Sequence, residues 1–125
     1  MGPQNTRTKQ LRQLMDNDKI IVAPGCYDAL SAKILEAAGF KVIYVTGYGL
    51  SASTLGSPDL GLVTMTEIEM RARNICNAVS LPVIVDADTG YGSAINVQRT
   101  VRQIEQTGAG GIQLEDQEWP KKCHS

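Results

Sequence analysis

The sequence lacks a long apolar run, a cluster of basic residues and a paired set of cysteines, and each absence removes a class of protein. No stretch approaches the roughly 18 apolar residues of a membrane-spanning helix, and the polar N-terminus has no signal-peptide core. The longest basic run is Lys121–Lys122 and the net charge is −1, so neither nucleic acid nor an anionic membrane is expected as a partner. Three widely spaced cysteines fit a reducing cytoplasm.

The composition that remains is that of a packed, water-soluble protein. Hydrophobic residues make up 42% and charged residues 20% of the 125 residues, which is close to the average for globular chains. This length supports one domain, but it falls short of the roughly 250 residues that a complete βα barrel needs. The sequence therefore predicts one domain, or half of a larger one.

Short apolar segments alternate with amphipathic segments along the chain. The strand segments are β-branched and no hairpin signal joins them, which predicts an α/β fold with a parallel sheet, buried on both faces by right-handed crossovers. The first helix is expected to cover one end of the sheet, and Thr64 and Glu67 have capping-box spacing before a later one. Strands are predicted at 20–23, 42–45, 83–85 and 111–114, and helices at 6–17, 27–38, 66–79 and 94–107.

One connection, residues 46–64, is predicted to be a long loop rich in glycine and serine. It follows a strand end, which is the side of an α/β sheet where ligands bind. Gly47, Gly49 and Ala52 match the G-x-G-x-x-A dinucleotide fingerprint, but they are expected to lead into a loop rather than a helix, so this interpretation is rejected. We predict instead that the backbone amides at 46–48 form an anion nest for a carboxylate.

Acidic residues follow the last two predicted strands. Asp86 and Asp88 stand in VIVDADTGYG, and Glu115 and Asp116 stand in GGIQLEDQ. If these strands are neighbours, they lie about 4.8 Å apart and their carboxylates converge. Hard oxygen ligands of this kind suit Mg²⁺. The alternative is that the acids cap helices or face solvent, but three of them beside a glycine-rich turn favour the metal site.

The C-terminal segment EDQEWPKKCHS places a cysteine among basic residues. Lys121, Lys122 and His124 are neighbours that lower the pKa of a thiol, which would allow Cys123 to transfer a proton near neutral pH. An ordinary surface cysteine explains the pattern equally well, and both interpretations stay open here. For Cys76, which stands on a predicted helix, packing in the core is the expected role.

Several of these segments, in this order, resemble a known family. PGCYDALSAK, YVTGYGLSAS, SPDLGLVTMTE, DADTGYG, LEDQ and PKKC are similar to segments of the isocitrate lyase/phosphoenolpyruvate mutase superfamily, and within it to the short-chain lyases for 2-methylisocitrate and 2,3-dimethylmalate. The resemblance covers almost the whole chain. It implies the N-terminal half, about four βα units, of a (β/α)₈ TIM-type barrel in a cytoplasmic enzyme of carboxylic acid metabolism, usually a homotetramer.

The resemblance also implies roles for single residues. Mg²⁺, with Mn²⁺ as the alternative, would be held by Asp86, Asp88 and Glu115, and a loop bearing PKKC would close over the site. Cys123 would be the proton donor and acceptor, with Lys121 and Glu115 as further catalytic residues. The predicted substrate-binding residues are Tyr44, Thr46, Gly47, Tyr48, Asp59, Asp86 and Gln113.

The implied reaction is a retro-aldol cleavage of a small 2-hydroxy acid. The metal stabilises negative charge on the 2-oxo acid, and Cys123 protonates the departing fragment. Oxaloacetate decarboxylases and phosphonomutases of the superfamily generally lack this cysteine, and they remain the alternatives together with a non-catalytic, self-associating half-barrel. The chain departs from the lyase pattern K-[KR]-C-G-H by reading KKCHS, which leaves the role of His124 open, and by Gln113 in place of a histidine.

The length is the larger departure from the lyase pattern. Strands five to eight, which in the family supply an arginine, a glutamate and an asparagine to the site, are not in the 125 residues. A four-stranded half-sheet would also expose an edge strand on each side, which favours association. We therefore expect the chain to be a truncated form that is inactive alone.

Overall fold

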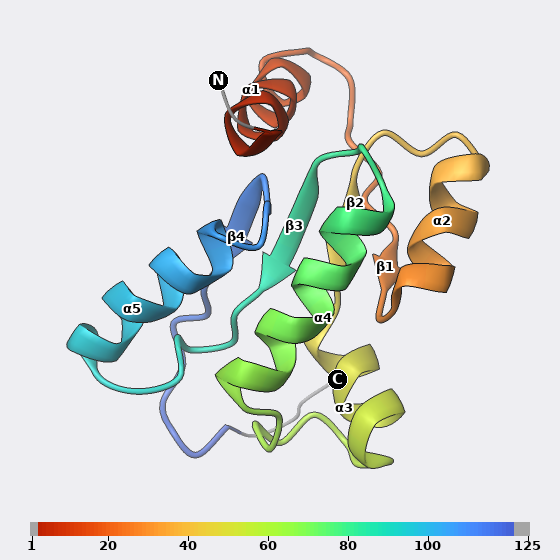
Figure 1. Ribbon diagram of the computed structural model, residues 1–125. Helices are drawn as coiled ribbons and strands as arrows, with labels where there is room; N and C mark the ends of the chain where they lie inside the picture. Colours follow the sequence, from red (N-terminus) through yellow and green to blue (C-terminus); the bar gives the residue numbers. More distant parts are fainter. Residues whose placement is uncertain (1–2, 122–125) are drawn as a thin grey trace.

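The computed structural model describes residues 3–121 and contains one four-stranded parallel sheet with helices packed against it (Figure 1). The strands are neighbours in the order β1-β2-β3-β4, so each βα unit adds one strand to the same side. The predicted α/β fold with parallel strands is confirmed. The elements in chain order are α1 (Pro3–Met15), β1 (Gly25–Cys26), α2 (Ala29–Ala37), β2 (Ile43–Val45), α3 (Gly47–Leu55), α4 (Met65–Ala78), β3 (Val83–Asp86), α5 (Ala94–Glu105) and β4 (Gly111–Gln113).

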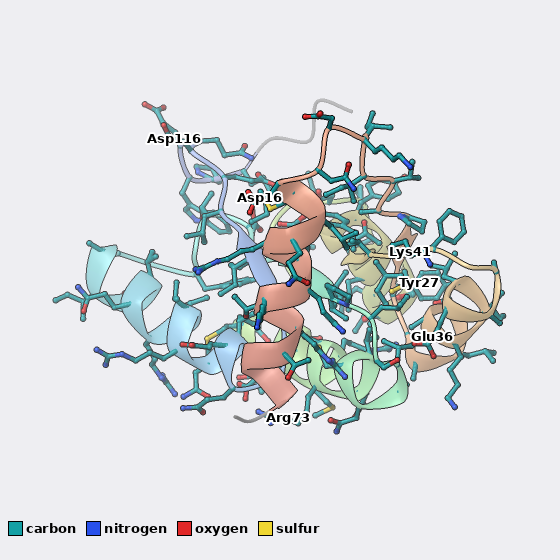
Figure 2. The ribbon with its side chains drawn as sticks, turned by 90° about the horizontal axis from the view of Figure 1, so that it is seen from above. Asp16, Tyr27, Glu36, Lys41, Arg73 and Asp116 are labelled. Carbon is teal, nitrogen blue, oxygen red and sulfur yellow. The ribbon has the colours of Figure 1, made fainter. Side chains whose placement is uncertain are left out.

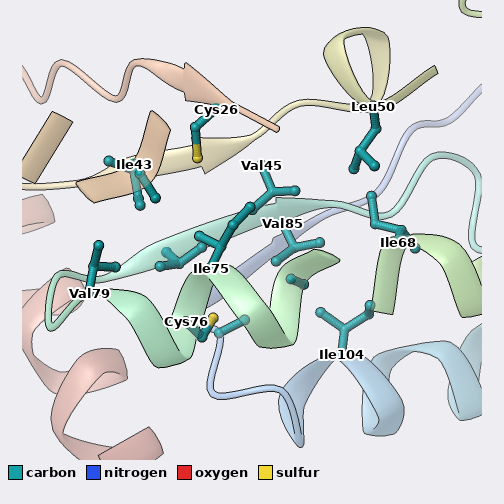
Figure 3. Packing of buried hydrophobic residues seen from close by; sticks show 14 residues of the cluster. Cys26, Ile43, Val45, Leu50, Ile68, Ile75, Cys76, Val79, Val85 and Ile104 are labelled. Atoms are coloured by element: carbon teal, nitrogen blue, oxygen red, sulfur yellow. The ribbon is translucent and has the colours of Figure 1, made fainter. Parts of the chain in front are cut away.

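The core lies between the two central strands and α4 (Figure 3). Val45 and Val85 are neighbours in the register of β2 and β3, and both are fully buried. Helix α4 turns Ile68 and Ile75 toward the sheet, seven residues apart and therefore on one face. Ile43 and Val45 of β2 are fully buried, whereas Tyr44 between them is only partly buried, so the strand alternates between a packed face and a more open one.

Helix α1 covers the end of the sheet where β3 and β4 begin, as predicted (Figures 1 and 2). Leu11 is buried and lies against Gly111, where a Cβ would come within 3.0 Å of its Cδ2. Arg7 donates hydrogen bonds to the carbonyl oxygens of Cys76 and Val79 at the C-terminal end of α4. These carbonyls have no partner inside the helix, so Arg7 attaches α1 by capping α4.

The predicted strand at 20–23 is wrong. Those residues form no strand, and Ile20 and Val22 are 90% and 60% exposed. Strand β1 begins later, where the carbonyl oxygens of Pro24 and Cys26 accept hydrogen bonds from the amides of Tyr44 and Thr46. An apolar, β-branched run predicts a strand only if a partner is available, and within residues 3–121 none pairs with the outer edge of β1.

The predicted loop at 46–64 is also corrected, because it contains helix α3. The Thr46 side chain caps this helix by accepting a hydrogen bond from the Gly49 amide at 3.2 Å, and Gly56 ends it in the left-handed conformation. The absence of a helix was our reason to reject the dinucleotide fingerprint, and that reason fails. The sheet order excludes the doubly wound fold instead, since that order would place β4 beside β1.

Candidate active site

The acidic residues gather where the strands end. Asp86 is the last residue of β3 and pairs in register with Gln113, the last residue of β4. The Asp88 amide donates to Asp86 Oδ1 at 2.9 Å, and the Glu115 amide donates to the Asp88 carbonyl at 2.8 Å. These hydrogen bonds hold the segments after β3 and β4 together, so the backbone brings the acids of the two segments side by side.

The turn that carries Asp88 has an unusual backbone. Asp88 and Tyr91 have positive φ values of 53° and 63°, and Gly90 between them has 99°. Aspartate adopts this region more readily than most residues, whereas a tyrosine there is strained. The turn is anchored to α5 by Thr100, whose buried hydroxyl donates to the Gly90 carbonyl at 2.8 Å. Such a rigid turn fixes the direction of the Asp88 carboxylate.

Lys121 lies at the centre of the acids. Its Nζ is 3.0 Å from Asp59 Oδ2, 3.2 Å from Asp88 Oδ1 and 3.6 Å from Glu115 Oε1, and its side chain is 5% exposed. Burial alone would lower the pKa of this ammonium, but the hydrogen bond with Asp59 and the charge of Asp88 outweigh it and raise the pKa. Lys121 therefore stays charged and compensates the carboxylates.

A direct metal-ligand set is not formed by the described side chains. Within residues 3–121, no three histidine, cysteine, aspartate or glutamate side chains stand close enough to bind one ion. Yet Asp88 Oδ1 is buried, and the Lys121 ammonium, a cation, lies 3.2 Å from it. A buried carboxylate oxygen that contacts a cation is a hard donor of the kind that Mg²⁺ takes, so the residues suit the group that the sequence predicts.

Two tyrosines line the same site. The Tyr44 hydroxyl hydrogen bonds to Asp86, and burial together with this carboxylate raises the Tyr44 pKa. Burial and the charges of Asp88 and Asp86 raise the pKa of Tyr91. Both phenols therefore remain protonated donors. The sequence analysis did not identify Tyr91, although its place in DADTGYG, beside the acids, was a usable signal.

Gly47 leaves room for the Asp86 carboxylate. A Cβ at this position would come 2.9 Å from Asp86 Oδ2, so any other residue would push the carboxylate away. Thr46 is used as the cap of α3, and Tyr48 is 57% exposed. Gln113 is exposed at the end of β4. Their substrate-binding roles stay predictions, and Lys122, Cys123 and His124 lie outside the described residues.

A cavity of about 690 Å³ opens beside the acids. Asp88 and Tyr91 line it, together with residues that include Met65, Arg99 and Trp119. Of the described residues that line it, Arg99 is the only cationic one. Cavities of this size hold small organic ligands. No helix within residues 3–121 is long and apolar enough to cross a membrane.

Comparison with known proteins gives one family and several relatives. A family model described as phosphoenolpyruvate phosphomutase matches residues 11–124. The chain is 56% identical to the 2,3-dimethylmalate lyase of Eubacterium barkeri over 119 residues, which are 95% of the chain and 41% of that enzyme. It is 50% identical to the 2-methylisocitrate lyase of Aeropyrum pernix over 113 residues, 90% of the chain and 36% of the relative.

A solved structure gives the same result. Phosphonopyruvate hydrolase in complex with oxalate and Mg²⁺ superposes with a TM-score of 0.88 at 38% identity, covering 93% of this chain and 41% of that one. The two proteins are therefore similar in sequence as well as in fold. The chain thus spans about two fifths of the length of the proteins it matches.

Proposed function

Because the chain belongs to the phosphoenolpyruvate phosphomutase family, we propose that it is the N-terminal part of a Mg²⁺-dependent lyase that splits a carbon–carbon bond in a small 2-hydroxy acid. The observation that carries this proposal is the gathering of carboxylate oxygens around one cationic point, where Lys121 Nζ lies within 3.6 Å of Asp59, Asp88 and Glu115. The lyase names of the relatives from E. barkeri and A. pernix support the reaction class.

In this proposal Asp86, Asp88 and Glu115 hold the metal, with Mn²⁺ as a substitute. When bound, the metal supplies positive charge that stabilises the developing 2-oxo acid. Gly47 and the amides at the start of α3 receive the substrate carboxylate, because a helix N-terminus favours negative charge. Tyr44 fixes the Asp86 carboxylate through its hydrogen bond. Lys121 balances the charge of the acids.

Bond cleavage then needs two proton movements by residues of the chain. The 2-hydroxyl gives its proton to a carboxylate of the cluster, and its C–O bond becomes a carbonyl. The electrons of the broken C–C bond remain on the departing carboxylic acid, and the Cys123 thiol protonates that carbon. Cys123 is two residues after Lys121 in the sequence, and we propose that its thiol supplies this proton.

The test uses the 125-residue chain and a fusion in which the C-terminal remainder of the E. barkeri enzyme follows it. We expect the fusion to convert 2,3-dimethylmalate to pyruvate and propionate in the presence of Mg²⁺, and the chain alone to be inactive. Pyruvate is measured with lactate dehydrogenase. Cys123→Ser in the fusion should abolish the cleavage. Pyruvate formation by the 125-residue chain as a verified monomer would contradict the inactivity, and a fully active Cys123→Ser fusion would contradict the mechanism.

A second function is favoured by one of the matches, since a phosphonopyruvate hydrolase shares the fold at 38% identity. Phosphonate or decarboxylase chemistry does not need the thiol. If the fusion acts on phosphonopyruvate or oxaloacetate and keeps that activity after Cys123→Ser, this alternative replaces the lyase.

The wider setting is part of the same proposal: a carboxylic acid substrate, a homotetramer and the cytoplasm. A stable folded assembly of the 125-residue chain without activity would instead favour the half-barrel module.

A further inference from the structure

Two loop segments from different βα units cross at the acidic site. One is 59–61, between α3 and α4, and the other is 119–121, after β4. They meet at two points: Lys121 Nζ donates to Asp59 Oδ1 at 3.0 Å, and the Trp119 ring lies on Gly61. Residues two apart on one segment thus contact residues two apart on the other, in opposite order. Each contact therefore holds the two segments in the alignment that the other contact requires.

The contact between Trp119 and Gly61 depends on the missing side chain of glycine. A Cβ at Gly61 would lie 2.6 Å from Cη2 and 2.7 Å from Cζ3 of the indole ring, closer than real atoms approach. Gly61 also has a φ of +76°, which side chains other than hydrogen rarely adopt. A larger residue at position 61 would therefore force the far end of the indole ring to move away, and Trp119, which is 63% exposed, has room to do so.

We infer that Trp119 is a positioning residue: its ring, seated on Gly61, holds the 119–121 segment so that Lys121 reaches Asp59 and the acids. The inference deepens the proposed function and rests on it for its catalytic meaning. An ion pair between flexible side chains holds a loop only weakly, because a lysine loses several rotatable bonds when it is fixed. The ring contact restricts the backbone two residues before Lys121, which lowers that entropic cost.

The reactivity of the Lys121 amine tests this directly. Reductive methylation followed by peptide mass spectrometry compares Lys121 with the exposed Lys41 in the same sample. We expect Lys121 to be protected in the unaltered chain and to react roughly tenfold faster in Gly61→Ala. The matched control is Gly56→Ala, because Gly56 also has positive φ (+63°) but a Cβ there meets no atom within 4 Å.

Changes at the ring itself avoid backbone strain. Trp119→Ala should release Lys121 as Gly61→Ala does, whereas Trp119→Phe, which keeps an aromatic ring, should restore most of the protection. Trp119 is the only tryptophan of the sequence, so its fluorescence reports the contact without a label. The emission spectrum of Trp119 should change in Gly61→Ala and stay unchanged in Gly56→Ala.

These measurements separate the inference from the proposed function. If the fusion shows no lyase activity but Lys121 protection depends on Trp119 and Gly61, the positioning role holds and the reaction is wrong. If Lys121 reacts equally fast in Gly61→Ala and Gly56→Ala, or stays protected in Trp119→Ala, the inference is overturned whatever the activity. In an active fusion, Trp119→Ala should lower kcat more than it changes KM, and Trp119→Phe should rescue kcat.

Discussion

At each end of the sheet a basic side chain links separate segments of the chain. The groups that it contacts differ between the two ends. At the end covered by α1, Arg7 donates to the neutral carbonyls of Cys76 and Val79. At the opposite end, Lys121 contacts three carboxylates, of Asp59, Asp88 and Glu115. Arg7 completes hydrogen bonds that the end of α4 requires in any state. Lys121 balances an excess of negative charge, and the proposed metal would balance the same charge.

The difference shows that the two ends of this parallel sheet have different tasks. Helix termini and apolar contacts at the α1 end stabilise the fold, whereas the carboxyl ends of the strands collect groups that repel one another unless a cation is present. The four predictions that follow test this division, beginning with the change that should cost the most stability.

Arg7→Ala should have the largest effect. Two partly buried carbonyls would lose a charged donor, so we expect the free energy of unfolding to fall by about 3 kcal/mol. Urea denaturation followed by circular dichroism measures the loss. Arg12→Ala on the exposed side of the same helix is the control and should change stability by less than about 0.5 kcal/mol. Equal losses in both variants would contradict the capping role of Arg7.

Lys121→Met should cost less, about 2 kcal/mol, because the carboxylates left unpaired are partly exposed and water reaches them. Millimolar Mg²⁺ should largely restore the stability lost in Lys121→Met, since a ligand that binds only the folded state stabilises it. It should not restore the stability lost in Arg7→Ala. Thermal unfolding with and without the metal measures both effects. If Mg²⁺ restores Arg7→Ala as well as Lys121→Met, the two ends do not differ as we describe.

The buried thiol of Cys26 makes the core between the ends sensitive to alkali. Burial, with the nearby Asp28 charge, raises its pKa from 9.0 to about 11. The unfolded chain loses this proton first, so stability should fall as the pH rises from about 9 to 11, by about 1.4 kcal/mol at about pH 10. Urea midpoints across this range should decline less steeply for Cys26→Ala; identical slopes would exclude the thiol as the cause.

Thr64→Ala should have the smallest effect, about 1 kcal/mol, although it removes a cap from the same helix that Arg7 caps. Thr64 and Glu67 form an exposed capping box at the site end of α4, where water replaces a lost hydrogen bond. Urea denaturation is again the measurement, and Thr64→Ser, which keeps the hydroxyl, should be near neutral. A loss as large as that of Arg7→Ala would show that both ends of α4 are equally critical.

The sequence predicted the architecture well because it depends on local patterns. Strict alternation of apolar strands and amphipathic helices placed three of the four strands, and Thr64 with Glu67 marked the start of α4. The run at 20–23 was misplaced because its hydrophobicity says nothing about whether a partner strand is present. Helix α3 was missed because its glycines and serines lower helix propensity, which the Thr46 cap and Gly56 overcome.

Only the site residues that directly follow a strand could be predicted from the sequence. The positions of Asp86, Asp88 and Glu115 depend on strand ends, which the pattern reveals. The contact of Lys121 with Asp59 joins residues 62 positions apart, and that of Trp119 with Gly61 joins residues nearly as distant. Such contacts depend on how two loops cross, and no periodicity encodes that. The sequence therefore gave no sign that Lys121 pairs with Asp59 and Asp88.

Asp88 places an unusual restriction on how this protein can evolve. Its amide, its carbonyl and its carboxylate serve three different neighbours while its φ is 53°. Asparagine would keep the turn and lose the charge, glutamate would keep the charge and strain the turn, and glycine would keep only the backbone. No single substitution preserves the backbone conformation, the hydrogen bonds and the charge together. Asp88 can therefore be replaced in evolution only if the neighbouring turn and the acid site change with it.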